Sequence, residues 1–202
     1  MQNASVIDNP SAVNPADIPE KMERHQLEWW ILFGICVAGK SAKQTEAKLN
    51  AFLDAGPMSR WDGDCIDSVF CRVRFYIKFK QLGWRLRHFK MGQYKRINKA
   101  FRAAVNLDLD NLTIESLESV PGLGPKTARM IILYYEPNAE CIPLDTHILK
   151  WLRANGYDAP KSTPPAGKKY RELELAFIAE GRKRDLTPAE WDTQVWKSYA
   201  KV

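Results

Sequence analysis

The stretch VPGLGPKTARM, Val120 to Met130, places a lysine directly after the residue types that make a tight turn. Gly122 and Gly124 can adopt backbone angles closed to other residues, so we expect a sharp turn there. Pro125 suits the first turn of a helix, where its missing N–H has no cost. From Lys126 onward the apolar spacing is helical. The stretch therefore predicts a helix N-terminus whose free N–H groups can bind a phosphate. An ordinary connection between two helices is the alternative.

A short helix from Thr113 to about Val120 is expected before this turn, which makes the whole a helix–hairpin–helix. The glycine backbone can approach a DNA phosphate closely because no side chain intervenes, and the dipole of the following helix favours the anion. A K⁺ or Na⁺ ion shared between the phosphate and the hairpin carbonyls of Val120 and Leu123 is compatible with this geometry. No side-chain metal site and no cofactor are expected.

Asp145 follows Lys126 by nineteen residues, in CIPLDTHILKWL, and stands at the start of another expected helix. An aspartate at a helix start often serves only as a cap. A lysine at the mouth of a DNA-binding hairpin and an aspartate at the next helix start can nevertheless face one cleft. This pair is the candidate for chemistry.

The net charge of +6 is concentrated in residues 72–102, which hold eleven Lys or Arg and no Asp or Glu. Such a block repels itself unless a polyanion lies against it, so nucleic acid is the favoured partner. An anionic membrane surface ranks below it, because Gly83 and Gly92 interrupt the apolar face that a membrane helix needs. The interleaved aromatic residues have the spacing of a helical core.

Composition is that of a soluble globular chain, with 45% hydrophobic and 27% charged residues. No apolar run reaches the roughly 18 residues that span a bilayer. The polar, Pro-rich start resembles neither a signal nor a transit peptide. The four cysteines have neither zinc-finger nor iron–sulfur spacing, which predicts four free thiols in a reducing compartment.

The fold class predicted is all-α, since no convincing two-residue alternation occurs. Capping signals and Gly or Pro breaks bound the expected helices. They cover residues 20–37, 41–54, 67–82, 93–106, 113–120, 125–135, 145–155, 170–180 and 188–199.

Two ordered motifs resemble the signature of the helix–hairpin–helix DNA glycosylase superfamily, the group of endonuclease III and the 8-oxoguanine glycosylases. The family hairpin L-P-G-V-G-x-K-T-A is matched by Val120, Pro121, Gly122, Leu123, Gly124, Lys126, Thr127 and Ala128. The family segment V-D-T-H-h-x-R is matched by Leu144, Asp145, Thr146, His147 and Ile148, with Lys150 in place of the arginine. The cysteine cluster of endonuclease III is missing, so the resemblance is to a compact form without an iron–sulfur cluster.

This resemblance implies base excision on a flipped-out nucleotide of double-stranded DNA, by a monomer. Asp145 would stabilise the positive charge that builds on the sugar, and Lys126 would attack C1′ to form a Schiff base, which permits strand cleavage as an AP lyase. The helix N-terminus and partial burial are expected to favour the neutral amine of Lys126. 8-Oxoguanine is the favoured substrate, followed by a 5-substituted pyrimidine.

The resemblance also implies two helical lobes with DNA held between them. Residues 19–40 and 137–202 would form one lobe, and residues 41–136 would form a central lobe that contains the helix–hairpin–helix at 113–135. Residues 1–18 are expected to be a flexible arm.

Further DNA contacts are expected from the hairpin and from the stretch KMGQYKR in the basic block. Gln93 would fill the gap left by the flipped nucleotide, and His147 would brace the loop at Asp145. The residues predicted to contact DNA are Gly122, Gly124, Thr127, Lys150, Gln93, Tyr94, Lys95, Arg96 and His147.

Two other functions remain open on the sequence. One is a phage enzyme of thymine hypermodification, which would use a glycosylase-like fold to transfer an amine or amino acid onto an activated thymine methyl. The other is a binding module that uses the hairpin without turnover. The expected location is the cytoplasm, in association with the nucleoid, or the cell that a phage infects.

Overall fold

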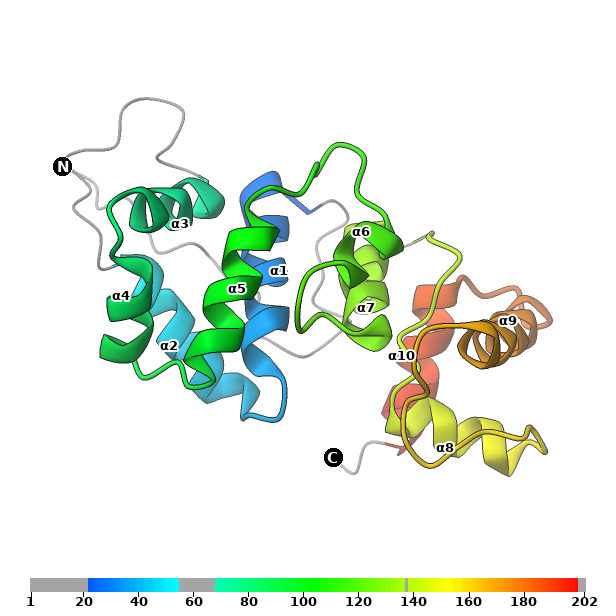
Figure 1. The fold of residues 1–202 in the computed structure, drawn as a ribbon. Helices are drawn as coiled ribbons and strands as arrows, with labels where there is room; N and C mark the ends of the chain where they lie inside the picture. Colours follow the sequence, from blue (N-terminus) through cyan, green and yellow to red (C-terminus); the bar gives the residue numbers. More distant parts are fainter. Residues whose placement is uncertain (1–21, 55–67, 137, 200–202) are drawn as a thin grey trace, which may run out of the picture. The chain divides into compact units, whose positions relative to one another are not determined.

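The computed structural model describes residues 22–54, 68–136 and 138–199, and every regular element in these ranges is an α-helix (Figure 1). The predicted all-α class is confirmed for this part of the chain. The helices form two compact units, Met1–Leu109 and Asp110–Val202. The predicted arm, residues 1–18, lies outside the described residues.

The first unit is built around a long apolar helix, α1. Residues Leu27 to Cys36 of α1 are all buried, and α1 packs against α2, α3 and α5. Trp29 anchors this core, because its indole N–H donates to Asn50 at 2.8 Å while its ring stacks on Phe33. The helices of this unit are α1 (Arg24–Val37), α2 (Ala42–Asp54), α3 (Val69–Lys78), α4 (Leu82–His88) and α5 (Tyr94–Ala104).

The second unit holds the helix–hairpin–helix and three longer helices. α6 packs on α7, and α10 packs on both α8 and α9. The aromatic rings of Trp151, Phe177 and Trp191 join α8, α9 and α10 in one apolar cluster. The helices are α6 (Ile114–Glu118), α7 (Pro125–Tyr135), α8 (Thr146–Ala154), α9 (Lys168–Arg182) and α10 (Pro188–Tyr199).

The expected helix over residues 67–82 is wrong in its C-terminal part. α3 ends at Lys78, and a separate helix, α4, begins at Leu82 and contains Gly83, so this glycine does not break a helix. Lys80 makes the turn between them with φ 57°, while the amide of Gln81 donates to the Tyr76 carbonyl at 2.8 Å. Glycine usually fills this left-handed position, so a lysine there leaves no sequence signal.

The two units group the helices differently from the predicted lobes. α1 packs within the first unit, whereas the prediction joined residues 19–40 to residues 137–202. Because the structure describes each unit by itself, the assignment of lobes stays a prediction.

The prediction of four free thiols is wrong, because Cys71 is disulfide-bonded. Cys36 and Cys141 are free and buried, and burial raises the pKa of each thiol to about 12. Those two thiols are therefore poor nucleophiles in the folded protein. The spacing of cysteines did not reveal the disulfide.

Candidate active site

The predicted hairpin between α6 and α7 is present. Thr113 caps α6, since its hydroxyl accepts from the Ser116 amide and the Ser116 hydroxyl accepts from the Thr113 amide. Gly122 takes the left-handed conformation at φ 95°, as expected. Gly124 does not, because its φ of −92° and ψ of 174° are open to any residue. A Cβ added at Gly124 would meet no atom within 4 Å, so the fold itself does not require a glycine there.

The N-terminus of α7 exposes the groups that could meet an anion. Pro125 occupies the first turn, and the amides of Lys126 and Thr127 donate to no acceptor in the described part of the chain. The Lys126 side chain is exposed, so the partial burial expected for it is not found. The amine of Lys126 is therefore accessible to a ligand from solvent.

Asp145 caps α8, and only one of its two oxygens is used in doing so. Oδ1 accepts from the amides of His147 and Ile148, both at 2.8 Å. Among the described residues nothing donates a hydrogen bond to Oδ2, and the side chain is half-buried. The cap fixes the carboxylate and leaves one oxygen for another partner.

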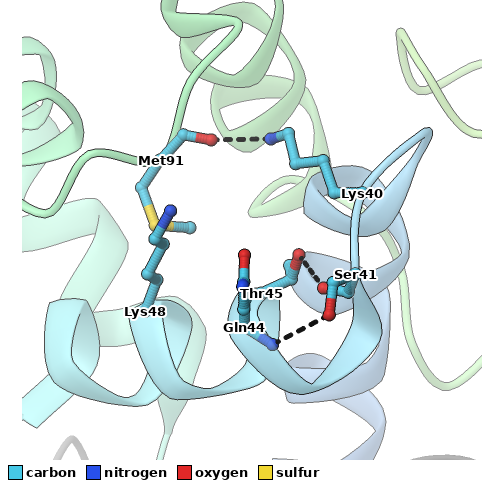
Figure 2. A pocket seen from close by; sticks show the side chains of 6 residues that line it. All are labelled: Lys40, Ser41, Gln44, Thr45, Lys48 and Met91. Atoms are coloured by element: carbon cyan, nitrogen blue, oxygen red, sulfur yellow. Dashed lines mark hydrogen bonds between the residues drawn. The ribbon is translucent and has the colours of Figure 1, made fainter.

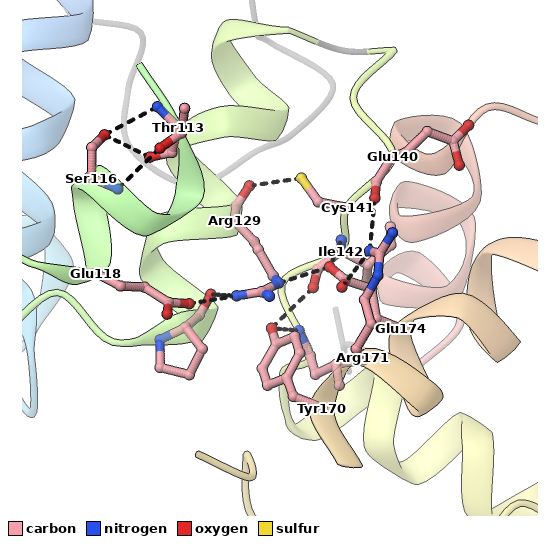
Figure 3. A network of polar contacts seen from close by, with 12 residues as sticks. Thr113, Ser116, Glu118, Arg129, Glu140, Cys141, Ile142, Tyr170, Arg171 and Glu174 are labelled. Carbon is pink, nitrogen blue, oxygen red and sulfur yellow. Dashed lines mark hydrogen bonds and ion pairs between the residues drawn. The ribbon is translucent and has the colours of Figure 1, made fainter. Parts of the chain in front are cut away.

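A buried polar network holds the segment that leads into Asp145 (Figure 3). Glu174 of α9 is fully buried, and its Oε1 accepts from Arg129 Nε and from the Ile142 amide, both at 2.8 Å. The Tyr170 hydroxyl accepts from the Leu144 amide at 2.9 Å and donates to the Ile142 carbonyl at 3.0 Å. Because buried backbone groups are costly to leave unpaired, these contacts fix the path of the chain before Asp145.

Arg129 links this network to the helix that carries Lys126. Its guanidinium also donates to Glu118 at 2.7 Å, and Glu174 Oε2 accepts from Arg171 at 2.7 Å. Burial lowers the pKa of Arg129, but the carboxylates of Glu174 and Glu118 outweigh burial and hold that pKa above its ordinary value. Since Arg129 stands three residues after Lys126 on α7, the network positions the Lys126 helix and the Asp145 segment together.

A second aspartate, Asp192 of α10, lies beside the predicted pair. Burial, followed by the charge of Asp145, raises its pKa to about 7 against the opposing charge of Lys126. Burial, followed by the charges of Asp192 and Asp145, also raises the pKa of Tyr134 on α7. Lys126 and Asp145 therefore both lie near enough to Asp192 for their charges to affect its pKa.

The side chains of α8 that follow Asp145 pack against α10. The His147 ring meets the Trp196 ring edge-on at 6.3 Å, and the Lys150 amine lies 5.1 Å from the centre of the Tyr199 ring. His147 is half-buried and Lys150 is exposed. His147 thus packs against α10, and the Lys150 side chain lies at the surface.

Sequence reasoning missed Asp192, Tyr134 and the Arg129–Glu174 network. For Asp192 a signal existed, because the stripe of Asp192, Trp196 and Tyr199 has helical spacing and sets an acid among aromatic residues. For the network no comparable signal exists, since Arg129 and Glu174 are 45 residues apart.

In the first unit, the predicted contacts of the basic block lie at the loop between α4 and α5. Lys90, Gly92 and Gln93 all have positive φ values, of 50°, 67° and 43°. The Lys40 amine donates to the Met91 carbonyl at 2.6 Å, at the edge of a small polar pocket (Figure 2). Arg96 donates to the Ile35 carbonyl at 2.8 Å and to the Gln93 side chain. Lys40 and Arg96 thus both help to hold the irregular backbone of this loop.

Several cations of the basic block serve the fold itself. Arg72 and Arg85 are buried, and Arg85 lies 4.1 Å from the centre of the Tyr76 ring. Gln93 and Lys95 are exposed, and Tyr94 is half-buried with Arg87 over its ring. The exposed Lys and Arg residues of the block remain available to a polyanion: Arg74, Lys78, Lys80, Arg87, Lys90, Lys95, Lys99 and Arg102.

Within the described residues, no group of three or more His, Cys, Asp or Glu side chains is arranged to hold a metal ion. In the same residues no helix is long and apolar enough to cross a membrane.

Two comparisons with known proteins bear on the hairpin and on the fold. The helix-hairpin-helix motif family matches residues 111–134, which contain α6, the hairpin and α7 as far as Tyr134. The crystal structure of the 8-oxoguanine DNA glycosylase of Methanocaldococcus jannaschii is similar, with a TM-score of 0.55 and 19% sequence identity over 87% of this chain and 80% of that chain. The chain thus carries a helix–hairpin–helix motif, and its all-helical fold is similar to that of this solved glycosylase.

Proposed function

We propose that this protein is a DNA glycosylase with AP lyase activity, which excises an oxidised or modified base from double-stranded DNA. The observation that carries the proposal is the cluster in the second unit, where the exposed amine of Lys126 and the carboxylate of Asp145 both act on Asp192. A protein that only binds DNA has no need of this cluster. The likeness to an 8-oxoguanine glycosylase makes 8-oxoguanine the first substrate to test.

In this proposal Lys126 is the nucleophile. Its nitrogen forms a bond to C1′ of the flipped nucleotide as the bond from C1′ to the base breaks, and the base leaves with that electron pair. Ring opening of the sugar then gives a Schiff base, from which β-elimination cleaves the strand. Asp145 stabilises the positive charge on the sugar in this proposal, through the Oδ2 to which no described residue donates.

The hairpin supplies the phosphate contacts in this proposal. The amides of Lys126 and Thr127, which have no acceptor in the part of the chain described, are suited to an anion at the start of α7, as is the exposed backbone at Gly122 and Gly124. A K⁺ or Na⁺ ion at the carbonyls of Val120 and Leu123 remains part of the proposal, as do contacts from Lys150 and His147.

For the first unit we propose that Gln93 fills the gap in the duplex, with Tyr94, Lys95 and Arg96 beside it. The left-handed backbone of Gln93 supports this role, because strained loop residues concentrate at functional sites. Gln93→Ala should lower activity on lesion DNA, while Gln81→Ala, at another exposed glutamine, should not. Equal activity of the two variants would contradict the role of Gln93.

The phosphate contact is tested by Gly124→Ala, which the fold accommodates because the added Cβ meets open space. We expect weaker binding of duplex DNA with little change in thermal stability. Gly83→Ala is the control, since a Cβ there makes only ordinary contacts of 3.6 Å or more. Unchanged binding by Gly124→Ala would place the phosphate elsewhere.

The decisive experiment is borohydride trapping on duplex oligonucleotides that each carry one modified base. Wild type should cross-link to one lesion, Lys126→Gln should not, and Lys161→Gln, at another exposed lysine, should behave as wild type. Asp145→Asn keeps a capping side chain and should slow base release by about 100- to 1,000-fold. Tight binding without base release on any lesion would overturn the proposal and favour a transferase or a binding module.

A further inference from the structure

Asp192 is a buried acid with no partner among the described residues. Asp192 is 8% exposed. In the described part of the chain its carboxyl group makes neither a hydrogen bond nor an ion pair. Buried carboxyl groups are almost always paired, because an unpaired one loses its hydration without compensation. A group retained in this state points to a partner that comes from outside the protein.

The titratable groups that act on Asp192 belong to α7 and to the start of α8. Asp145, at the start of α8, adds negative charge, and Lys126, at the start of α7, adds positive charge. Tyr134, near the end of α7, is also coupled to Asp192. α9 packs on α10 too, but in the described residues none of its charged side chains contributes to the pKa of Asp192.

The two aspartates have different environments and are suited to different tasks. Asp145 accepts two amide hydrogen bonds through Oδ1, so it serves as an acceptor. Asp192, with a pKa raised to about 7 by burial and by Asp145, exchanges its proton near neutral pH. When the environments of two carboxyl groups push their pKa values apart, one group can act as the acid and the other as the base of one active site.

We propose that Asp192 carries the proton that links attack by Lys126 to departure of the base; this inference rests on the proposed function. The Asp192 carboxylate takes one proton from the Lys126 ammonium, which leaves a neutral amine and a carboxylic acid. The amine then bonds to C1′, the base departs with the electron pair of the broken bond, and Asp192 returns the proton to the base. The net result is transfer of one proton from Lys126 to the departing base, with no other reactant.

The role is tested by single-turnover base release between about pH 5.5 and 9. Asp192→Asn should lower the rate at neutral pH by about 100-fold and remove an ionisation near pH 7 from the profile, with DNA affinity unchanged. Asp192→Glu should recover part of the rate, because it restores the carboxyl group. Asp185→Asn, at an exposed aspartate, should match wild type.

A second measurement needs no activity. Carboxyl carbon resonances of the free protein should include one that titrates near pH 7, that is absent in Asp192→Asn and that moves to higher pH in Lys126→Gln. Titration of Asp192 near pH 4, or an active wild type whose rate is unaffected by Asp192→Asn, would overturn the inference alone. A wild type that releases no base would overturn the proposed function together with the inference.

Discussion

Two buried carboxyl groups of the second unit, Glu174 on α9 and Asp192 on α10, have opposite surroundings. Glu174 is fully buried and accepts hydrogen bonds from Arg129, Arg171 and the Ile142 amide. Asp192 is nearly as buried, yet among the described residues it has no hydrogen-bond or ion-pair partner, and its pKa is raised to about 7. The difference shows that burial alone does not set the role of an acid: a paired carboxylate fixes the chain, and an unpaired one costs stability and remains reactive.

The largest effect is expected when Glu174 loses its carboxylate. Glu174→Leu leaves Arg129 buried without this partner and the Ile142 amide without an acceptor, which should cost about 3–5 kcal/mol of unfolding free energy. Glu174→Gln retains an acceptor for that amide and should cost less. Urea unfolding measures both, and a cost below about 1 kcal/mol for Glu174→Leu would remove the contrast with Asp192.

Asp192 should make stability fall as the pH rises. Its folded pKa of about 7 lies above the ordinary value of 3.8, so between these values the folded protein binds more protons than the unfolded chain. The unfolding free energy should therefore decline from about pH 4 to about pH 7. A pKa raised from 3.8 to about 7 corresponds to a decline on the order of 4 kcal/mol.

Asp192→Asn should remove this decline and make the protein more stable than wild type at pH 8, because the variant has no buried charge to form. Urea unfolding of both proteins at pH 4, 6 and 8 checks the prediction. Parallel stability curves would mean that Asp192 is not held in the environment described above.

A smaller effect is expected at Tyr170, which belongs to the same polar network as Glu174. Tyr170→Phe removes the hydroxyl that joins the Leu144 amide to the Ile142 carbonyl, and leaving these buried groups unpaired should cost about 1–3 kcal/mol. Tyr157→Phe is the control, because within the described ranges its hydroxyl bonds to the side chain of Glu180 and to no backbone group. In thermal unfolding, Tyr170→Phe should melt at a clearly lower temperature than Tyr157→Phe. Equal melting temperatures would contradict the role of the network in holding the Asp145 segment.

The smallest effect is expected at Glu28, the buried acid of the first unit. Its carboxylate accepts from neutral donors, the Ser68 hydroxyl and the Phe70 amide. Glu28→Gln can keep the bond from the amide, and the hydroxyl of Ser68 can rotate to suit the new side chain. We expect a change of less than about 1 kcal/mol in urea unfolding. A cost as large as that of Glu174→Leu would show that the charge itself matters at Glu28.

Local signals in the sequence predicted the elements that carry the candidate site. The expected bounds of α7 and α10 agree with the structure, since Pro at the first turn and the Thr187–Glu190 capping pair define them locally. Asp145 as the cap of α8 was read in the same way. Where a lysine makes the turn usually made by glycine, as at Lys80, the local signal is absent and α4 was missed.

The sequence by itself determined an all-helical chain, a hairpin that begins a helix, a lysine and an aspartate each at a helix start, and a one-sided basic block. These features depend on neighbours within a few residues, which a pattern can show. Only the tertiary structure decided that Lys126 is exposed, that Glu174 is paired with Arg129 and that Asp192, close to Asp145, has no partner among the residues described. Burial and charge coupling between distant residues arise when helices pack, and no local pattern encodes them.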